Sequence, residues 1–136
     1  MSTKSELMGL GVPHFVAQRL GNTPIDVTVA GATMGDARVC GLGEYDLQVH
    51  TSNGSGTGLV LKSPASVDGY SLGDQISLVN LLGTSIILYI RGAKVVFNGL
   101  SVSGTGGVSV GAGQVCFVRP ISASTWSILG SVLSAA

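Results

Sequence analysis

The stretch from Gly73 to Gly130 constrains the fold most, because short apolar segments alternate there with glycine-marked turns. Such segments, bounded by glycine, are typical of β-strands joined by tight turns. Nucleophiles, acids, bases and metal ligands are polar side chains, and this half of the chain offers few of them. It is a scaffold rather than a reaction site, so function must lie in surfaces and assembly. Its formally charged residues are Asp74, Arg91, Lys94 and Arg119.

Residues 24–136 follow the same pattern and are predicted to form one all-β body. Outward and inward residues alternate with a period of two in 25–29, 45–49 and 75–79, as they do in strands. The regular turns predict antiparallel pairing in a β-sandwich, a jelly roll or a small barrel. Residues 52–58 (SNGSGTG) are expected to be an exposed flexible loop. Further strands are expected at 37–41, 58–62, 85–90, 93–97, 100–103, 107–110, 114–119 and 125–130, with turns at Asn98-Gly99 and at the glycine clusters 54–58 and 104–107. Those clusters lead into strands and not into helices, so they predict turns and not phosphate-binding loops.

Residues 1–23 carry the helical signals and are predicted to form a short N-terminal arm. Ser5 or Thr3 can cap a first helix, and Pro13 is a good first position for a second helix that stops at Gly21. Two helices this short are marginal in water and cannot hide their apolar residues on each other. The arm must therefore dock on another surface. Its apolar residues are Leu7, Met8, Leu10, Phe15, Val16 and Leu20.

The charge balance narrows the choice of partners. Charged residues make up 10% of the 136 residues and the formal net charge is zero, whereas soluble domains average about a quarter charged residues. Weak self-repulsion of this kind favours association. Nucleic-acid binding needs clustered basic side chains, and the seven Lys and Arg are spread along the chain. We expect no nucleic-acid partner.

Targeting and membrane signals are not visible in the sequence. Hydrophobic residues reach 45%, but polar residues interrupt every window of roughly 18 residues that a membrane span would need. The N-terminus has no apolar stretch followed by a small-residue cleavage site. We therefore expect synthesis in a cytoplasm and no membrane partner.

Paired carboxylates are the best candidates for chemistry in this chain. Glu44 and Asp46 are two residues apart, so in a strand they would point to the same face, as a glycosidase-type pair requires. Asp26, Asp36 and Asp68 would have to join them by folding. Solvated carboxylates on strands and turns are the simpler interpretation, and we expect no enzyme activity, cofactor or metal.

The other reactive side chains are better explained as structure. His14 and His50 are the two histidines, and the sequence has no GxSxG turn that would present a serine nucleophile to either of them. We therefore do not expect a catalytic site in which a histidine activates a nucleophile. Cys40 and Cys116 lack metal-ligand spacing and lie in apolar segments, which predicts two reduced core thiols. Trp126 could be a core residue, an interface residue or a platform for sugar rings.

Two pieces of the sequence resemble proteins of tailed-bacteriophage virions. The segment Ser5–Gly21 (SELMGLGVPHFVAQRLG) resembles the N-terminal peptide of many such proteins. The segment Gly73–Trp126 is similar to a β module of head-decoration and head-fibre proteins. The shared pattern is Gly-Asp, Ile-Ser-Leu-Val-Asn, Asn98-Gly99, Val108-Ser109-Val110, Gly111-Ala112-Gly113, Cys116-Phe117-Val118 and Thr125-Trp126.

This resemblance implies a capsid decoration (cement) protein on the surface of the virion. Such a protein would bind the lattice of the major capsid protein and stabilise the head. Because exposed apolar surface usually marks an interface, we expect the six apolar arm residues to contact the capsid protein or a neighbouring copy. The alternative is that the arm packs against its own β body. The protein would form homo-oligomers, a trimer in preference to a dimer. The alternative is a receptor- or glycan-binding module of a phage fibre, with specificity in loops 51–58 and 63–73.

Overall fold

The structure is a computed structural model that describes residues 24–130 and 133–136. Within these residues every regular element is a strand, so the described part is all-β as the sequence predicted. The helical arm expected at 1–23 lies outside it. The strands are β1 (Ile25–Val29), β2 (Arg38–Cys40), β3 (Asp46–Ser52), β4 (Gly58–Leu61), β5 (Ile76–Asn80), β6 (Ile86–Ile90), β7 (Lys94–Phe97), β8 (Leu100–Ser103), β9 (Val108–Val110), β10 (Val115–Ser122), β11 (Thr125–Gly130) and β12 (Leu133–Ala135).

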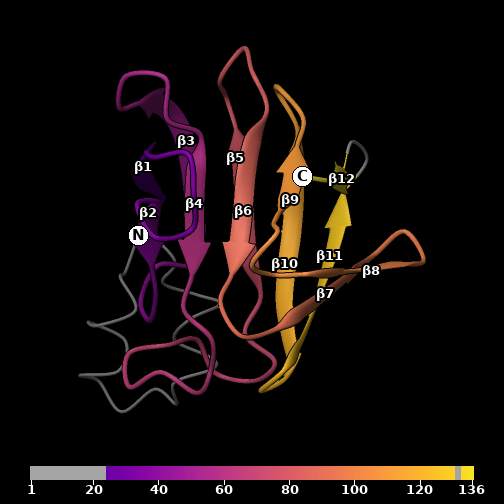
Figure 1. Cartoon of the computed structure of the whole chain (residues 1–136). Helices are drawn as coiled ribbons and strands as arrows, with labels where there is room; N and C mark the ends of the chain where they lie inside the picture. Colours follow the sequence, from indigo (N-terminus) through magenta and orange to yellow (C-terminus); the bar gives the residue numbers. More distant parts are fainter. Residues whose placement is uncertain (1–23, 131–132) are drawn as a thin grey trace.

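These strands form two mixed sheets that enclose one core (Figure 1). The larger sheet has the order β1-β3-β5-β10-β11-β7-β8 and the smaller has the order β12-β9-β6-β4-β2. From β1 to β6 the chain alternates between the two sheets. It therefore winds around the core, as the coils of a solenoid do. As a result β1, β3 and β5 are parallel neighbours in one sheet, and β2, β4 and β6 are parallel neighbours in the other.

The sequence predicted antiparallel pairing, and this prediction is wrong for the neighbouring strands among β1 to β6, which pair in parallel. The prediction holds for β9 and β10: β10 pairs antiparallel with β5 and β11, and β9 pairs antiparallel with β6 and β12. Strand β7 adds to β11 in parallel. A period of two shows which residues face the core but carries no information on strand direction. Whether two neighbouring strands are parallel or antiparallel depends on whether the chain between them turns back within one sheet or crosses to the other sheet.

Strand positions were predicted well, because each of the eleven expected strands is present with ends within a few residues. Strand β12 was not predicted. The hairpin of β7 and β8 extends away from the two layers (Figure 1). It turns at Asn98-Gly99, where both residues have positive φ, 49° and 78°. This is the backbone of a type I′ turn, for which Asn-Gly is the preferred pair.

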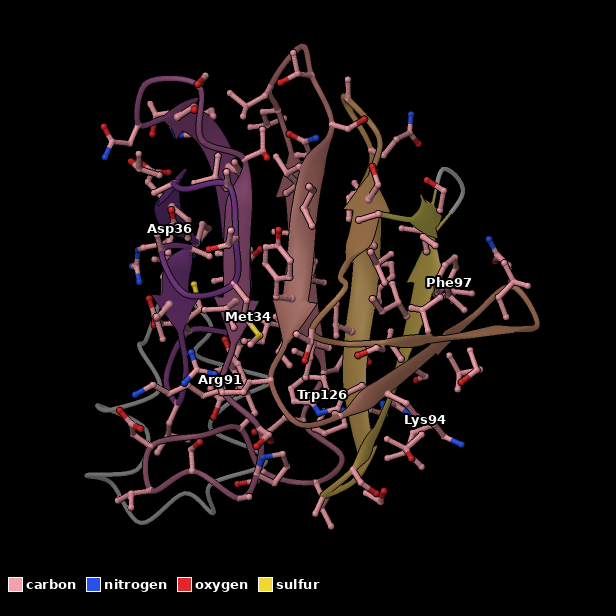
Figure 2. The ribbon with its side chains drawn as sticks, viewed as in Figure 1. Met34, Asp36, Arg91, Lys94, Phe97 and Trp126 are labelled. Atoms are coloured by element: carbon pink, nitrogen blue, oxygen red, sulfur yellow. The ribbon has the colours of Figure 1, made fainter. Side chains whose placement is uncertain are left out.

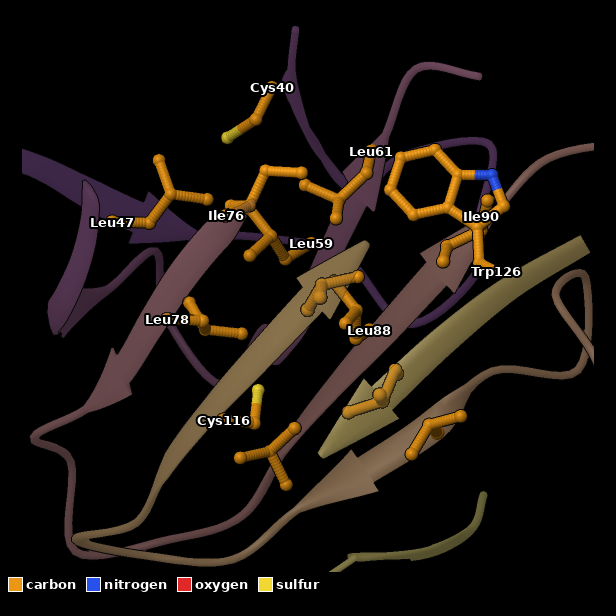
Figure 3. Packing of buried hydrophobic residues seen from close by; sticks show 14 of the residues in the cluster. Cys40, Leu47, Leu59, Leu61, Ile76, Leu78, Leu88, Ile90, Cys116 and Trp126 are labelled. Carbon is orange, nitrogen blue, oxygen red and sulfur yellow. The ribbon is translucent and has the colours of Figure 1, made fainter. Parts of the chain in front are cut away.

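The core consists of the inward-facing residues of both sheets (Figure 3). Trp126 is fully buried and meets Tyr70 edge to face, with ring centroids 6.0 Å apart. The core interpretation of Trp126 is therefore the correct one. Cys40 and Cys116 are also fully buried, as predicted.

Asn80 is a fully buried polar residue at the end of β5. Its Nδ2 donates to the carbonyl oxygens of Thr84 and Gly111, each at 3.0 Å, and its Oδ1 accepts from the amide of Leu82 at 3.1 Å. Nδ2 also lies 3.3 Å from the carbonyl oxygen of Val110. The side chain thus ties β5 to its own loop and to the end of β9.

The glycine clusters allow close packing. A Cβ on Gly104 would lie 1.9 Å from the carbonyl oxygen of Ile90, and one on Gly56 would lie 2.4 Å from the amide nitrogen of Gly31.

The loop 52–58, expected to be exposed and flexible, is exposed at 53–55, but a hydrogen bond joins its two ends. The Ser52 hydroxyl donates to the carbonyl oxygen of Gly56 at 2.5 Å.

Candidate functional site

Glu44 and Asp46, the candidates for a glycosidase-type pair, do not form a common site. Glu44 precedes β3, where its carboxylate accepts from the Gly41 amide at 3.1 Å and forms an ion pair with Arg38 at 3.3 Å. Asp46 lies in β3 and accepts from the hydroxyl of Ser77 on β5 at 3.1 Å. The two carboxylates are therefore engaged with different partners, and each arrangement is that of a structural contact.

The remaining aspartates also have local partners. The amide and hydroxyl of Thr33 both donate to Asp36 at 2.8 Å, and these hydrogen bonds lower the pKa of Asp36. The ammonium group of Lys62, 2.5 Å from Asp68, lowers the pKa of that carboxyl. Asp26 lies 3.0 Å from Nε2 of His50. These contacts hold turns and strand ends in place.

Both thiols are protected from reaction by the core. Burial raises the pKa of Cys40 and of Cys116 to about 12. Nearby Glu44 adds to the effect at Cys40. A thiol reacts as its thiolate, so both side chains are protonated and inert at neutral pH. Among the described residues no cluster of three His, Cys, Asp or Glu could hold a metal ion, and no helix could span a bilayer.

The feature that stands out is the solvent-facing side of the larger sheet. There Val115, Phe117 and Leu129 are 43%, 42% and 70% exposed, and Val79 is half-buried. The pairing register places Val79 opposite Val115 and Phe117 opposite Leu129, so the four side chains are neighbours on adjacent strands. We call these four residues the outer apolar patch. Contiguous exposed apolar surface of this kind marks an interaction site more often than scattered single residues do.

A shallow hollow of about 430 Å³ adjoins the outer apolar patch. It is lined by Phe117, Leu129, Ser127, Arg119, Gln75 and Val118. Nη2 of Arg119 donates to Oε1 of Gln75 at 3.2 Å. The hollow is open and its wall is partly apolar, which fits a side chain of another protein better than an enclosed small molecule.

The solvent side of the smaller sheet is different, because it is covered by the chain itself. Val60 and Tyr89 point away from the core, yet they are only 4% and 6% exposed. They form a second apolar cluster with Ala37, Met34 and Ile87. Figure 2 labels Met34 of this cluster. The segment that contains Met34 thus covers the smaller sheet, whereas the outer apolar patch is exposed within the described residues.

Sequence reasoning missed the outer apolar patch, although a signal was present. In β10 the residues of both faces are apolar from Val115 to Val118, and only one face can belong to the core. A strand with two apolar faces in a two-layered protein indicates a covered outer face or an interface. The expected contact residues Leu7, Met8, Leu10, Phe15, Val16 and Leu20 lie outside the described residues.

Searches against protein-family models, curated proteins and solved structures found no match to this chain.

Proposed function

We propose that this chain is a structural protein of a virion, a capsid decoration (cement) protein that binds the major capsid protein and stabilises the head. The observation that carries the proposal is the outer apolar patch on a two-layered β body. A sheet supported from behind by a packed core presents its outward side chains in fixed positions. Such a surface suits protein–protein adhesion, in which a few well-packed apolar residues supply most of the binding energy.

The resemblance of 73–126 to the β module of head-decoration proteins selects the capsid among possible partners. Many copies on one lattice would bind through avidity, so each contact can be weak. We assign the capsid or subunit contact to the arm residues Leu7, Met8, Leu10, Phe15, Val16 and Leu20, with Phe15 and Leu20 as anchors. The outer apolar patch adds a second adhesive surface on the β body. In the same proposal the β body is a sandwich and the arm is helical.

Co-sedimentation with empty capsids tests this function. We expect the parent protein to pellet with capsids and Phe15→Asp to remain in the supernatant, while its melting temperature stays close to that of the parent. Gln18→Asp is the matched control, because it adds the same charge to the arm at a polar position and should still bind. If Phe15→Asp melts well below the parent and still pellets with capsids, the arm belongs to the core and the assignment is wrong.

A second candidate is the receptor- or glycan-binding module of a phage fibre. It is favoured by the loop 63–73, where Val67 is fully exposed at the tip beside the Lys62–Asp68 ion pair. In that case Val67→Asp should abolish binding of the purified protein to host cells or to their surface glycans. Binding to cells without binding to capsids would select this function over decoration.

A further inference from the structure

A cavity of about 160 Å³ lies on the outer side of the smaller sheet, at the end where β4 and β6 finish. Its lining combines two basic side chains, two hydroxyls and two valines, namely Lys62, Arg91, Ser63, Ser66, Val39 and Val60. None of these residues belongs to the outer apolar patch or to the arm. The cavity is therefore separate from the two adhesive surfaces of the proposed function.

Parallel pairing brings the two basic side chains to the same place. Leu61 at the end of β4 is paired with Ile90 at the end of β6, and both face the core. Lys62 and Arg91 each follow by one residue, so they are neighbours on strands about 4.8 Å apart and leave the sheet on its outer side. Figure 2 labels Arg91 toward this end of the layers.

The two basic side chains differ in whether their charge is neutralised. The ammonium group of Lys62 lies 2.5 Å from the carboxylate of Asp68. Arg91 is exposed and has no ion-pair partner among the residues that the structure describes. Two positive charges and one carboxylate leave one positive charge at the cavity, and it belongs to a guanidinium. A guanidinium binds a carboxylate through two parallel hydrogen bonds, so the cavity favours a ligand with one carboxylate.

The loop around the cavity is held in one shape, and its hydroxyls are available to a ligand. The amide of Ser66 donates to the carbonyl oxygen of Ser63 at 3.0 Å, and the amide of Tyr70 donates to that of Lys62 at 3.2 Å. The hydroxyls of Ser63 and Ser66 have no hydrogen-bond partner within the described part of the chain. Val39, which is 43% exposed, adds an apolar wall. Such a lining suits a ligand that has hydroxyls and a C–H face besides its charge.

We propose that this cavity binds an acidic sugar, a six-membered ring that bears a carboxylate. A cavity of about 150 Å³ is large enough for a benzene ring, so this one has room for a single sugar ring. The carboxylate binds Arg91, the ring hydroxyls bind Ser63 and Ser66, and the C–H face of the ring packs on Val39. Inorganic phosphate has no apolar face and leaves that wall uncovered. The proposal goes beyond the decoration function and does not depend on it.

Titration with glucuronate, followed through the amide chemical shifts of the ¹⁵N-labelled protein, tests the site. We expect saturable shifts at Ser63, Ser66 and Arg91, with a dissociation constant of about 1 mM, which is usual for a ligand of this size. Glucose offers the ring without the carboxylate, and inorganic phosphate offers charge without the ring. Each should bind at least about ten-fold more weakly than glucuronate. No saturable shift with glucuronate at about 20 mM, or equal binding of glucose or phosphate, would overturn the proposal.

Substitutions assign the binding to this cavity. Arg91→Gln should weaken glucuronate binding at least about ten-fold. Arg119→Gln is the matched control, because Arg119 is an exposed arginine on the larger sheet, and it should leave the binding unchanged. Ser66→Asp is a second variant: Ser66 is exposed, and the new carboxylate should repel the ligand without disturbing the fold.

Melting temperatures show which variants are folded, and Ser66→Asp decides if Arg91→Gln is not. Folded variants that bind glucuronate as tightly as the parent would show that the cavity is not the site. Co-sedimentation of the same variants with empty capsids should equal that of the parent, because the capsid contact uses other residues. Loss of this sugar site would therefore leave the decoration function standing.

Discussion

Replacement of Asn80 by alanine tests whether one buried amide holds the ends of the two sheets together. The side chain is fully buried, donates to the carbonyl oxygens of Thr84 and Gly111, and accepts from the amide of Leu82. Asn80→Ala removes these three hydrogen bonds. The carbonyl oxygen of Gly111 keeps the amide of Gln114 at 3.3 Å, Thr84 is exposed and Leu82 is half-buried. Each former partner can therefore still bind another protein group or water, so the loss is that of hydrogen bonds at their ordinary net value.

The expected loss follows from these three bonds. At about 1 kcal/mol each, the free energy of unfolding should fall by about 3 kcal/mol. For a chain of this length, one kcal/mol shifts the melting temperature by roughly 4 °C, so the midpoint should fall by about 12 °C. Asn80→Asp should be more damaging at pH 7 than at pH 4, because the ionised carboxylate cannot donate to the carbonyl oxygens and its protonated form can.

Thermal and urea unfolding followed by circular dichroism measure the effect. Asn53→Ala is the matched control, because Asn53 is exposed and its backbone forms the hydrogen bonds to Val29 and Gly56. It should change the free energy of unfolding by less than about 0.5 kcal/mol. If Asn80→Ala is no more destabilising than Asn53→Ala, water or a local shift replaces the lost bonds and the argument from buried hydrogen bonds fails.

Two further predictions concern the thiols and the β7–β8 turn. Because burial raises the pKa of Cys40 and Cys116 from 9.0 to about 12, only the unfolded state ionises between these values, and each thiol should cost about 1.4 kcal/mol of stability at pH 10 relative to pH 8. Urea midpoints at both pH values should show a shallower loss in Cys116→Ala, and an equal loss would contradict the burial of that thiol. Gly99→Ala should destabilise by about 1 kcal/mol, because Gly99 has a φ of 78° and open space around it. The control Gly83→Ala, also in open space but without the positive φ, should not destabilise in the same unfolding assay, and equal effects would show that the turn is not strained.

The sequence by itself determined where the strands lie and which of their residues form the core. Period-two alternation identified β1, β3 and β5, and glycine-marked turns separated most of the others. The turn at Asn98-Gly99 was predictable because few residue pairs tolerate two successive positive φ values. The burial of Cys40 and Cys116 followed from the apolar segments around them. These are local properties, set by backbone sterics and by the need to remove apolar surface from water.

Only the tertiary structure decided the direction of the strands and the identity of the exposed surface. Parallel pairing of β1, β3 and β5 arises because the chain crosses to the other sheet between them, and no local pattern records that crossing. Phe117 and Val118 are adjacent apolar residues in β10. In the folded chain Val118 faces the core and Phe117 faces solvent. Glu44 and Asp46 are two residues apart in the sequence, but β3 begins at Asp46, so Glu44 lies in the preceding loop and each carboxylate has a different partner. Such outcomes depend on which segments meet across the core, which is a property of the whole chain.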